Sequence, residues 1–238
     1  PTENEPLPAS LVSENLETGS TRTWRDSVIT EPDGRFAHVY WAPFRAEYGR
    51  TYRLTVERTS EGQGSSRVEA KVPDSSRIEL GEAEILGSAR QNVFIRGNIP
   101  HLTKVQVVYD VKFGPGQLAA TTTEVALDYD DEPERTEDGW KMLIALSRDF
   151  DRVQQRLQER GIFNQTFGVI LIEMRIEMLA VNDAWDPPGG TFDAELLVQP
   201  GTLSNVEDGF GFVGAGYGLE REYLPPDSVL QDAGFRTR

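Results

Sequence analysis

The sequence contains no cysteine and only two histidines among its 238 residues. The absence of cysteine excludes disulfide bonds, thiol nucleophiles and every metal site with cysteine ligands. No apolar run approaches the roughly 18 residues that a helix needs to cross a bilayer. Pro1 begins neither a signal peptide nor a natural start, so we expect the chain to be part of a longer protein.

Basic residues are scarce as well: 24 stand against 39 acidic residues, for a net charge of -15 at pH 7. Nucleic acids and anionic membranes attract proteins through Lys and Arg, so this balance argues against both as partners. Only four of the basic residues are Lys. The acidic excess is typical of salt-adapted proteins, although a GC-rich genome also enriches Arg over Lys. The hydrophobic content of 38%, with 22 Gly and 14 Pro, is typical of a folded chain rich in turns.

The N-terminal part predicts antiparallel strands. Residues 1–20 are polar and aperiodic, which predicts an extended lead-in. Residues 21–75 carry four strand patterns, the clearest at Tyr52, Leu54 and Val56, which alternate with polar residues and so share one face. Four strands are fewer than the seven of an immunoglobulin-like sandwich. We therefore expect an immunoglobulin-like portion whose sheet is incomplete. Either residues ahead of Pro1 or the second half of the chain supplies the remaining strands.

A boundary is expected near residue 75, where Pro-Asp-Ser-Ser interrupts the strand pattern. Residues 76–218 then predict a second β-rich domain, with strands at 77–86, 92–99, 105–113, 121–129, 140–146, 172–178 and 191–198. Residues 219–238 are charged and contain proline, which predicts an appendage. The fold class expected from these patterns is mainly β.

One α-helix is expected at residues 147–160. Ser147 is the expected N-cap, and Asp149 and Asp151 suit the positive end of the helix dipole. Gly161 can adopt the left-handed conformation that ends a helix. The apolar stripe of this helix, which must pack against a sheet, consists of Phe150, Val153 and Leu157.

Residues 209–214 read Gly-Phe-Gly-Phe-Val-Gly, which matches the dinucleotide-binding pattern G-x-G-x-x-G. That motif binds phosphate at the N-terminus of a following helix. No helix pattern follows Gly214, so we expect a strand that another backbone crosses closely, and no cofactor.

An acidic loop is the single candidate metal site. Its hard oxygen ligands for Ca²⁺ are Asp128, Asp130, Asp131 and Glu132. Pro133 stands where the loop of an EF-hand requires glycine, so a solvated loop is the favoured interpretation.

No catalytic constellation is found. His38 and His101 lack neighbouring nucleophiles or metal ligands at useful spacings. With 39 acids a close carboxylate pair is to be expected by number alone, so a carboxylate-based hydrolase stays open as an alternative without a specific signal. A carbohydrate-binding module is a further alternative, because tryptophans can stack on sugar rings; the four are Trp24, Trp41, Trp140 and Trp185.

Two segments resemble the domain of unknown function 4249 family. Residues 202–217, Thr-Leu-Ser-Asn-Val-Glu-Asp-Gly-Phe-Gly-Phe-Val-Gly-Ala-Gly-Tyr, look like its closing motif, in which a Ser-Asn-aliphatic-x-Asn/Asp-Gly run leads into a Gly-Phe-rich strand. Residues 48–56, Tyr-Gly-Arg-Thr-Tyr-Arg-Leu-Thr-Val, and the Val-Pro exit at 72–73 resemble its early strand and turn.

The resemblance implies an exported lipoprotein of Bacteroidota-type cell envelopes, anchored in the outer membrane through a lipidated cysteine. It also implies a TonB-dependent outer-membrane receptor as a partner. The family has no established catalytic residue to carry over, and this chain lacks the cysteine that bears the lipid. The expected function is that of a non-catalytic accessory or binding protein that uses loops and exposed sheet edges.

Overall fold

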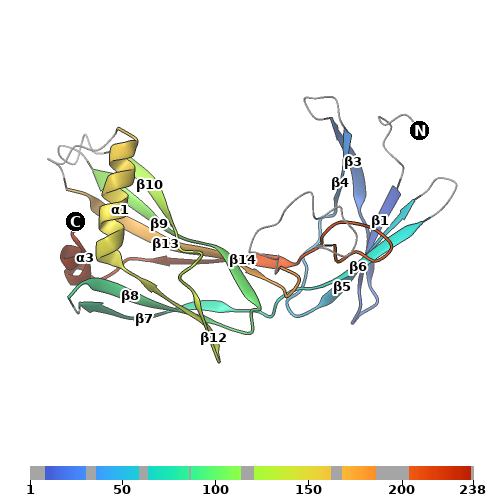
Figure 1. Ribbon diagram of the computed structural model, residues 1–238, viewed down its shortest axis with the longest axis horizontal. Coiled ribbons are helices and arrows are strands. Elements are labelled where there is room, and N and C mark those ends of the chain that lie inside the picture. Colours follow the sequence, from blue (N-terminus) through green and yellow to red (C-terminus); the bar gives the residue numbers. More distant parts are fainter. Residues whose placement is uncertain are drawn as a thin grey trace. The chain divides into compact units, whose positions relative to one another are not determined.

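The computed structural model is mainly β and consists of several antiparallel sheets (Figure 1). It describes residues 9–30, 36–58, 64–85, 87–113, 121–161, 168–185 and 204–236. The chain forms two compact units: the first comprises Pro1–Asp74 and Val181–Gly216, and the second comprises Ser75–Ala180 and Tyr217–Arg238.

The strands of the first unit, apart from the end of β13, are β1 (Ala9–Asn15), β2 (Thr21–Thr23), β3 (Arg25–Thr30), β4 (Phe36–Trp41), β5 (Thr51–Arg58) and β6 (Ser65–Lys71). The second unit holds β7 (Arg77–Ile85), β8 (Ala89–Arg96), β9 (His101–Phe113), β10 (Thr121–Asp128), β11 (Glu134–Thr136), β12 (Gly139–Ile144), α1 (Leu146–Glu159), β13 (Ile170–Val181), β14 (Gly216–Tyr223) and α3 (Asp227–Ala233). The strand predicted at 191–198 lies outside the described residues.

The second unit is built on two four-stranded sheets, with strand orders β10-β9-β13-β14 and β11-β12-β8-β7. Alternate residues of both sheets meet in one apolar core. On β9 the predicted apolar face is confirmed, because all of its members are buried: Val105, Val107, Tyr109, Val111 and Phe113. Met174, Ile176 and Met178 of β13 are buried in the same alternating way, which confirms a strand there.

Helix α1 contacts β10 of one sheet and β8 of the other, and it also contacts α3 (Figure 1). Its predicted stripe is confirmed, since Val153 and Leu157 are buried. The predicted N-cap is wrong: the helix begins at Leu146 after Ala145, and the Oγ of Ser147 accepts a hydrogen bond from the Ala89 backbone N–H at 3.1 Å. The hydroxyl therefore fastens the helix to β8 instead of capping it.

The lead-in expected at residues 1–20 is wrong where the structure describes it. Strand β1 pairs with both β2 and β5, so it is an inner strand of the sheet β2-β1-β5-β6. Its buried side chains are Leu11, Ser13 and Asn15. Two of these three are polar, and for that reason a search for alternating apolar residues missed the strand.

The appendage expected at residues 219–238 is also wrong, since β14 and α3 belong to the second unit. Val229, Leu230 and Ala233 of α3 are buried in its core, and a second helix therefore stands beside the one predicted. Helix α3 has only seven residues, which is too short for a periodic pattern to stand out.

The predicted range of the second domain, residues 76–218, also differs from the structure. Residues 181–216 belong to the first unit, where the backbone of Glu207 pairs with that of Arg67 on β6 and the ring of Trp185 meets that of Phe212. The boundary at Asp74 and Ser75 lies where the sequence pattern is interrupted.

Phe235 fixes the C-terminal segment to the core. Its ring is 2% exposed, stacks on Tyr109 at 6.0 Å and meets the ring of Phe150 edge-on at 4.9 Å. We expect Phe235→Ala to lower the free energy of unfolding by about 3–5 kcal/mol, the usual cost of removing a buried phenyl ring. Leu224→Ala, at a side chain 45% exposed, is the control and should change it by less than about 0.5 kcal/mol. Urea denaturation measures both, and equal stabilities would mean that this segment is an appendage after all.

Candidate functional site

A buried carboxylate joins three elements of the second unit. The Oδ2 of Asp149, in the first turn of α1, accepts hydrogen bonds from the hydroxyls of Tyr109 on β9 at 2.5 Å and Tyr129 after β10 at 2.6 Å. Asp149 and Tyr109 are 0% exposed. Arg152 Nη1 lies 3.4 Å from the second carboxylate oxygen, Oδ1.

Burial dominates the electrostatics of this cluster. It raises the pKa of Asp149, while the hydrogen bonds donated by the two tyrosines and the charges of Arg152 and Arg148 act in the opposite direction. Burial and the neighbouring carboxylate raise the pKa of Tyr109 well above its ordinary value. The tyrosines therefore remain neutral donors to Asp149 at physiological pH.

The geometry assigns a structural role to Asp149. Neither oxygen of its side chain reaches solvent, and the guanidinium groups of Arg148 and Arg152 lie over the Tyr129 ring, at 5.4 and 5.7 Å from its centroid. A substrate entering from the solvent meets the arginines and not the acid. The carboxylate thus ties α1 to β9 and β10.

The sequence analysis named Asp149, but only as an acidic residue that suits the positive end of the helix dipole. Asp149 precedes the buried Val153 and Leu157 at intervals of four, so it lies on the buried stripe of the helix. A carboxylate on such a stripe requires buried partners. Those partners lie 40 and 20 residues away in the chain, beyond the reach of a local pattern.

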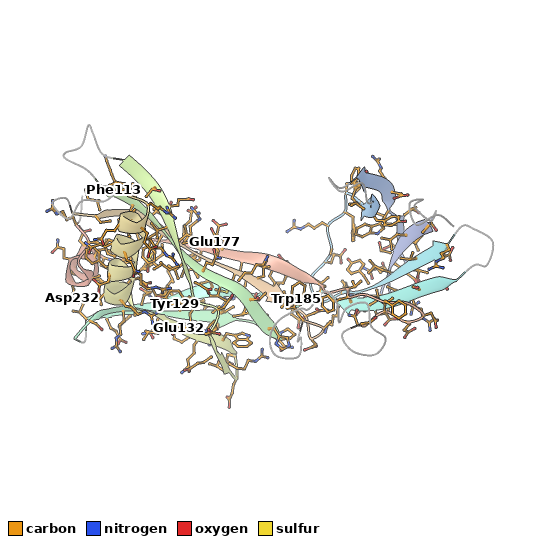
Figure 2. All side chains as sticks on the ribbon, turned by 45° about the horizontal axis from the view of Figure 1, so that its top comes forward. Phe113, Tyr129, Glu132, Glu177, Trp185 and Asp232 are labelled. Carbon is orange, nitrogen blue, oxygen red and sulfur yellow. The ribbon has the colours of Figure 1, made fainter. Side chains whose placement is uncertain are left out.

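The four candidate calcium ligands line one pocket together with Arg148 and Arg152, but their oxygens have other partners or are exposed. Asp130 Oδ1 accepts the Val105 backbone N–H at 2.6 Å, and Asp128 Oδ1 accepts the N–H of Asp130 at 2.9 Å. Glu132, which Figure 2 labels, pairs with Arg148 at 3.0 Å, and Asp131 is exposed. Among the described residues, no three carboxylates or histidines are grouped to hold a metal ion. The carboxylate oxygens of Asp128, Asp130 and Glu132 therefore bind backbone N–H groups and an arginine instead of a metal ion.

In the first unit, the segment of the family-like closing motif folds as a tight loop. The Asn205 side chain spans it, because Nδ2 donates to the Val213 carbonyl at 2.8 Å and Oδ1 accepts the Val213 N–H at 2.9 Å. The loop is fastened to β6 by the paired backbones of Glu207 and Arg67 and by the Ser66 hydroxyl, which donates to the Asp208 carbonyl at 2.8 Å. We call residues 204–215 the Asn205 loop.

The glycines of the Asn205 loop serve packing, not phosphate binding. A Cβ on Gly209 would lie 2.6 Å from Ser66 Oγ, and one on Gly214 would lie 2.6 Å from the Trp185 ring. No helix follows; β14 begins at Gly216. The dinucleotide pattern therefore lacks the element that binds phosphate. The expected strand crossed by another backbone is wrong as well, because residues 209–214 form a loop and the atoms close to Gly209 and Gly214 belong to side chains.

Phe210 and Phe212 alternate in direction within this loop. Phe212 meets the Trp185 ring edge-on at 5.4 Å, whereas Phe210 is 61% exposed. Asp208 has a φ of 53° and Gly211 one of 117°, so left-handed backbone flanks the exposed ring on both sides. The sequence located this loop through its motif but gave no signal of which ring faces solvent.

The tryptophans occupy separate surroundings. Trp41 is 46% exposed, with the guanidinium of Arg25 at 5.0 Å from its ring, while the other three are half-buried. Trp24 donates to Ser13 Oγ and Trp140 to the Ile99 carbonyl, both at 3.0 Å. His38 lies in β4 and His101 begins β9.

Removing the buried charge should change how stability depends on pH. Because the pKa of Asp149 is raised in the folded state, folding favours its protonated form. The stability that this carboxyl contributes is complete below the unfolded pKa of about 3.9 and is lost as pH rises through the folded pKa. The advantage of the wild type over Asp149→Asn in unfolding free energy should therefore be larger near pH 4 than near pH 7.

The matched control is Asp151→Asn, which removes an exposed carboxylate two residues further along α1. It should keep the pH dependence of the wild type, measured by urea denaturation across this range. If the free energies of unfolding of the wild type and Asp149→Asn differ by the same amount at every pH, the raised pKa assigned to Asp149 is contradicted.

Comparison with known proteins adds no relative: no family model matches the chain, and no curated protein matches it. Among the described residues, no helix combines the length and the apolar character needed to cross a membrane. The resemblance to the domain of unknown function 4249 family thus rests on the motifs themselves, and it enters below as part of a proposal.

Proposed function

We propose that this chain is the non-catalytic binding ectodomain of an exported, outer-membrane-associated lipoprotein, and that it docks onto a protein partner such as a TonB-dependent receptor. The observation that carries the binding role is Phe210, an aromatic ring held 61% exposed on the fastened Asn205 loop. The envelope location and the kind of receptor follow from the family resemblance.

The backbone around Phe210 is fixed before any partner arrives. The Asn205 side chain holds one end of the loop at Val213, and Ser66 and Arg67 of β6 hold the other at Asp208 and Glu207. A prearranged loop loses little conformational entropy on binding. Aromatic anchors of this kind supply much of the energy at protein interfaces.

Most of the large exposed apolar side chains among the described residues belong to the first unit. Of the six large ones among the described residues, four belong to it: Val39, Trp41, Tyr48 and Phe210. The apolar core cluster, by contrast, lies in the second unit. The division indicates that the second unit supplies stability and the first supplies contact surface.

The charge around Phe210 defines the partner. Asp208, two residues before the ring, is exposed; Glu207, three residues before it, is also exposed but pairs with Arg67. The whole chain carries a charge of -15. A complementary surface is an apolar pocket, one phenyl ring wide, with Lys or Arg at its rim.

The two alternatives have weaker support. Sugar-binding platforms use exposed, coplanar aromatic rings, and three of the four tryptophans are half-buried in separate places. A carboxylate hydrolase needs an accessible acid of raised pKa. Asp149, whose pKa is raised, is 0% exposed.

Photo-crosslinking tests the proposal. With p-benzoylphenylalanine in place of Phe210, irradiation in an envelope extract should crosslink a β-barrel receptor at a peptide that contains both apolar and basic residues. The same amino acid in place of Phe212, whose ring lies against Trp185, is the matched control and should crosslink far less.

Affinity for the captured receptor should fall about 30-fold in Phe210→Ala, the loss of a typical interface hot spot of about 2 kcal/mol. Leu224→Ala, also at an exposed apolar side chain but in the second unit, should bind as the wild type does. Failure of the wild type to bind any envelope receptor contradicts the proposed function. Equal binding by Phe210→Ala removes the anchor role alone.

A further inference from the structure

A small polar cavity lies in the first unit, apart from the exposed anchor just described. Its volume is about 240 Å³, below the size of pockets for drug-sized ligands. Its described lining residues are Ser13, Asn15, Ser20, Thr21, Arg22, Phe44, Arg45, Glu47 and Tyr52. Ser13 and Asn15 are 3% and 4% exposed, so buried polar side chains form part of the lining.

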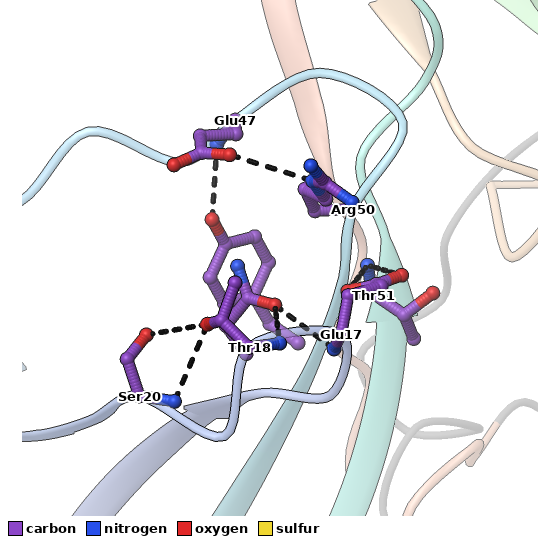
Figure 3. Close-up of polar contacts among 8 residues, drawn as sticks. Glu17, Thr18, Ser20, Glu47, Arg50 and Thr51 are labelled. Carbon is purple, nitrogen blue, oxygen red and sulfur yellow. Dashed lines mark hydrogen bonds and ion pairs between the residues drawn. The ribbon is translucent and has the colours of Figure 1, made fainter.

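The fold occupies the acceptor atoms of these side chains. Asn15 Oδ1 accepts the backbone N–H groups of Glu17 at 3.0 Å and Thr18 at 3.2 Å, as Figure 3 shows around those residues. Ser13 Oγ accepts the Trp24 indole N–H, and the Tyr52 hydroxyl accepts the Glu47 backbone N–H, both at 3.0 Å.

The donors of the same groups remain available. Within the described part of the chain, nothing accepts the Nδ2 hydrogens of Asn15 or the hydroxyl hydrogens of Ser13 and Tyr52. These hydrogens are therefore open to acceptor atoms of a molecule that enters the cavity. The lining therefore offers several hydrogen-bond donors.

Two arginines add positive charge at the same place. Neither Arg22 nor Arg45 lies within 4.0 Å of a carboxylate of the described residues, although arginines elsewhere in this acidic chain form many such pairs. The described lining contains one carboxylate, Glu47, and it pairs with Arg50 at 3.4 Å (Figure 3). The open guanidinium groups favour a ligand with an anionic group.

Phe44 gives the cavity an apolar side. Its ring meets Trp24 edge-on at 5.7 Å and Tyr52 at 5.8 Å, so its position is fixed from two sides. Such a ring can cover the apolar face of a ligand ring.

We propose that this cavity binds a small organic carboxylate with a hydroxylated ring, of the size of a single sugar acid. Arg22 and Arg45 hold the carboxylate, the hydrogens of Asn15, Ser13 and Tyr52 bind ring oxygens, and Phe44 covers one ring face. The site is independent of the docking role of Phe210.

Titration calorimetry with the intact chain tests this at low ionic strength, using D-glucuronate as the probe. About a dozen non-hydrogen atoms at ordinary ligand efficiency give a Kd on the order of 1 mM. D-glucose, which lacks the carboxylate, and sulfate, which lacks the ring, should each bind at least tenfold more weakly. Binding of sulfate or glucose as tight as that of D-glucuronate overturns the proposal, as does the absence of any binding of D-glucuronate.

Arg22→Gln and Arg45→Gln should each weaken D-glucuronate binding about tenfold. Both side chains are exposed, so the variants should fold, and thermal melting verifies this. Arg58→Gln, at an exposed arginine of the first unit outside the lining, is the matched control and should bind as the wild type does. Unchanged binding in both lining variants contradicts the assignment. Phe210→Ala should leave D-glucuronate binding intact, and this separates the cavity from the proposed docking surface.

Discussion

The buried carboxylate of Asp149 is the interaction on which the second unit depends. One oxygen atom receives hydroxyl hydrogens from Tyr109 and Tyr129, so a single side chain of α1 fixes two neighbouring strands. The ring of Tyr109 also supports the stacked ring of Phe235, which brings the C-terminal segment into the same arrangement. An unpaired buried charge would cost several kcal/mol, so helix, sheet and C-terminal segment must assemble together.

The first unit uses side-chain amides for a related purpose. Asn205 bridges its loop to Val213, and Asn15 holds the turn at Glu17 and Thr18. Asn182 accepts the Ala215 N–H at 3.3 Å where the loop ends. In each case an amide replaces a missing backbone partner and fixes an irregular segment. Fixed irregular segments can present groups that regular strands cannot. Here these groups are the exposed ring of Phe210 and the hydrogen-bond donors of the small polar cavity.

Sequence patterns predicted those elements whose information is local. The alternation along β9 and β13, the stripe of α1 and its closing Gly161, with a φ of 68°, follow from side-chain spacing and backbone geometry. Strand β1 was missed because polar Ser13 and Asn15 occupy its buried positions. Asp149 looked like a residue that suits the helix dipole because its tyrosine partners lie on distant strands.

The two proposed binding regions depend even more on distant contacts. The motif of the Asn205 loop was recognisable in the sequence, yet the exposure of Phe210 follows from β6, whose Ser66 and Arg67 lie about 140 residues earlier. The small polar cavity of the first unit is lined by residues of β1, β2, β5 and the segment after β4. None of these residues belongs to a recognisable motif. A chain without a catalytic pattern can therefore still form sites that only the fold brings together.

Our central proposal is that the first unit binds the partner, while the second unit is a structural core. Amide hydrogen exchange of the protein with and without its crosslinked receptor partner tests this most directly, because bound surfaces exchange more slowly. We expect added protection in residues 204–215 and in the adjoining β6, with no change around Tyr109, Tyr129 and Asp149. Added protection centred on those three residues, with the Asn205 loop unaffected, would contradict it.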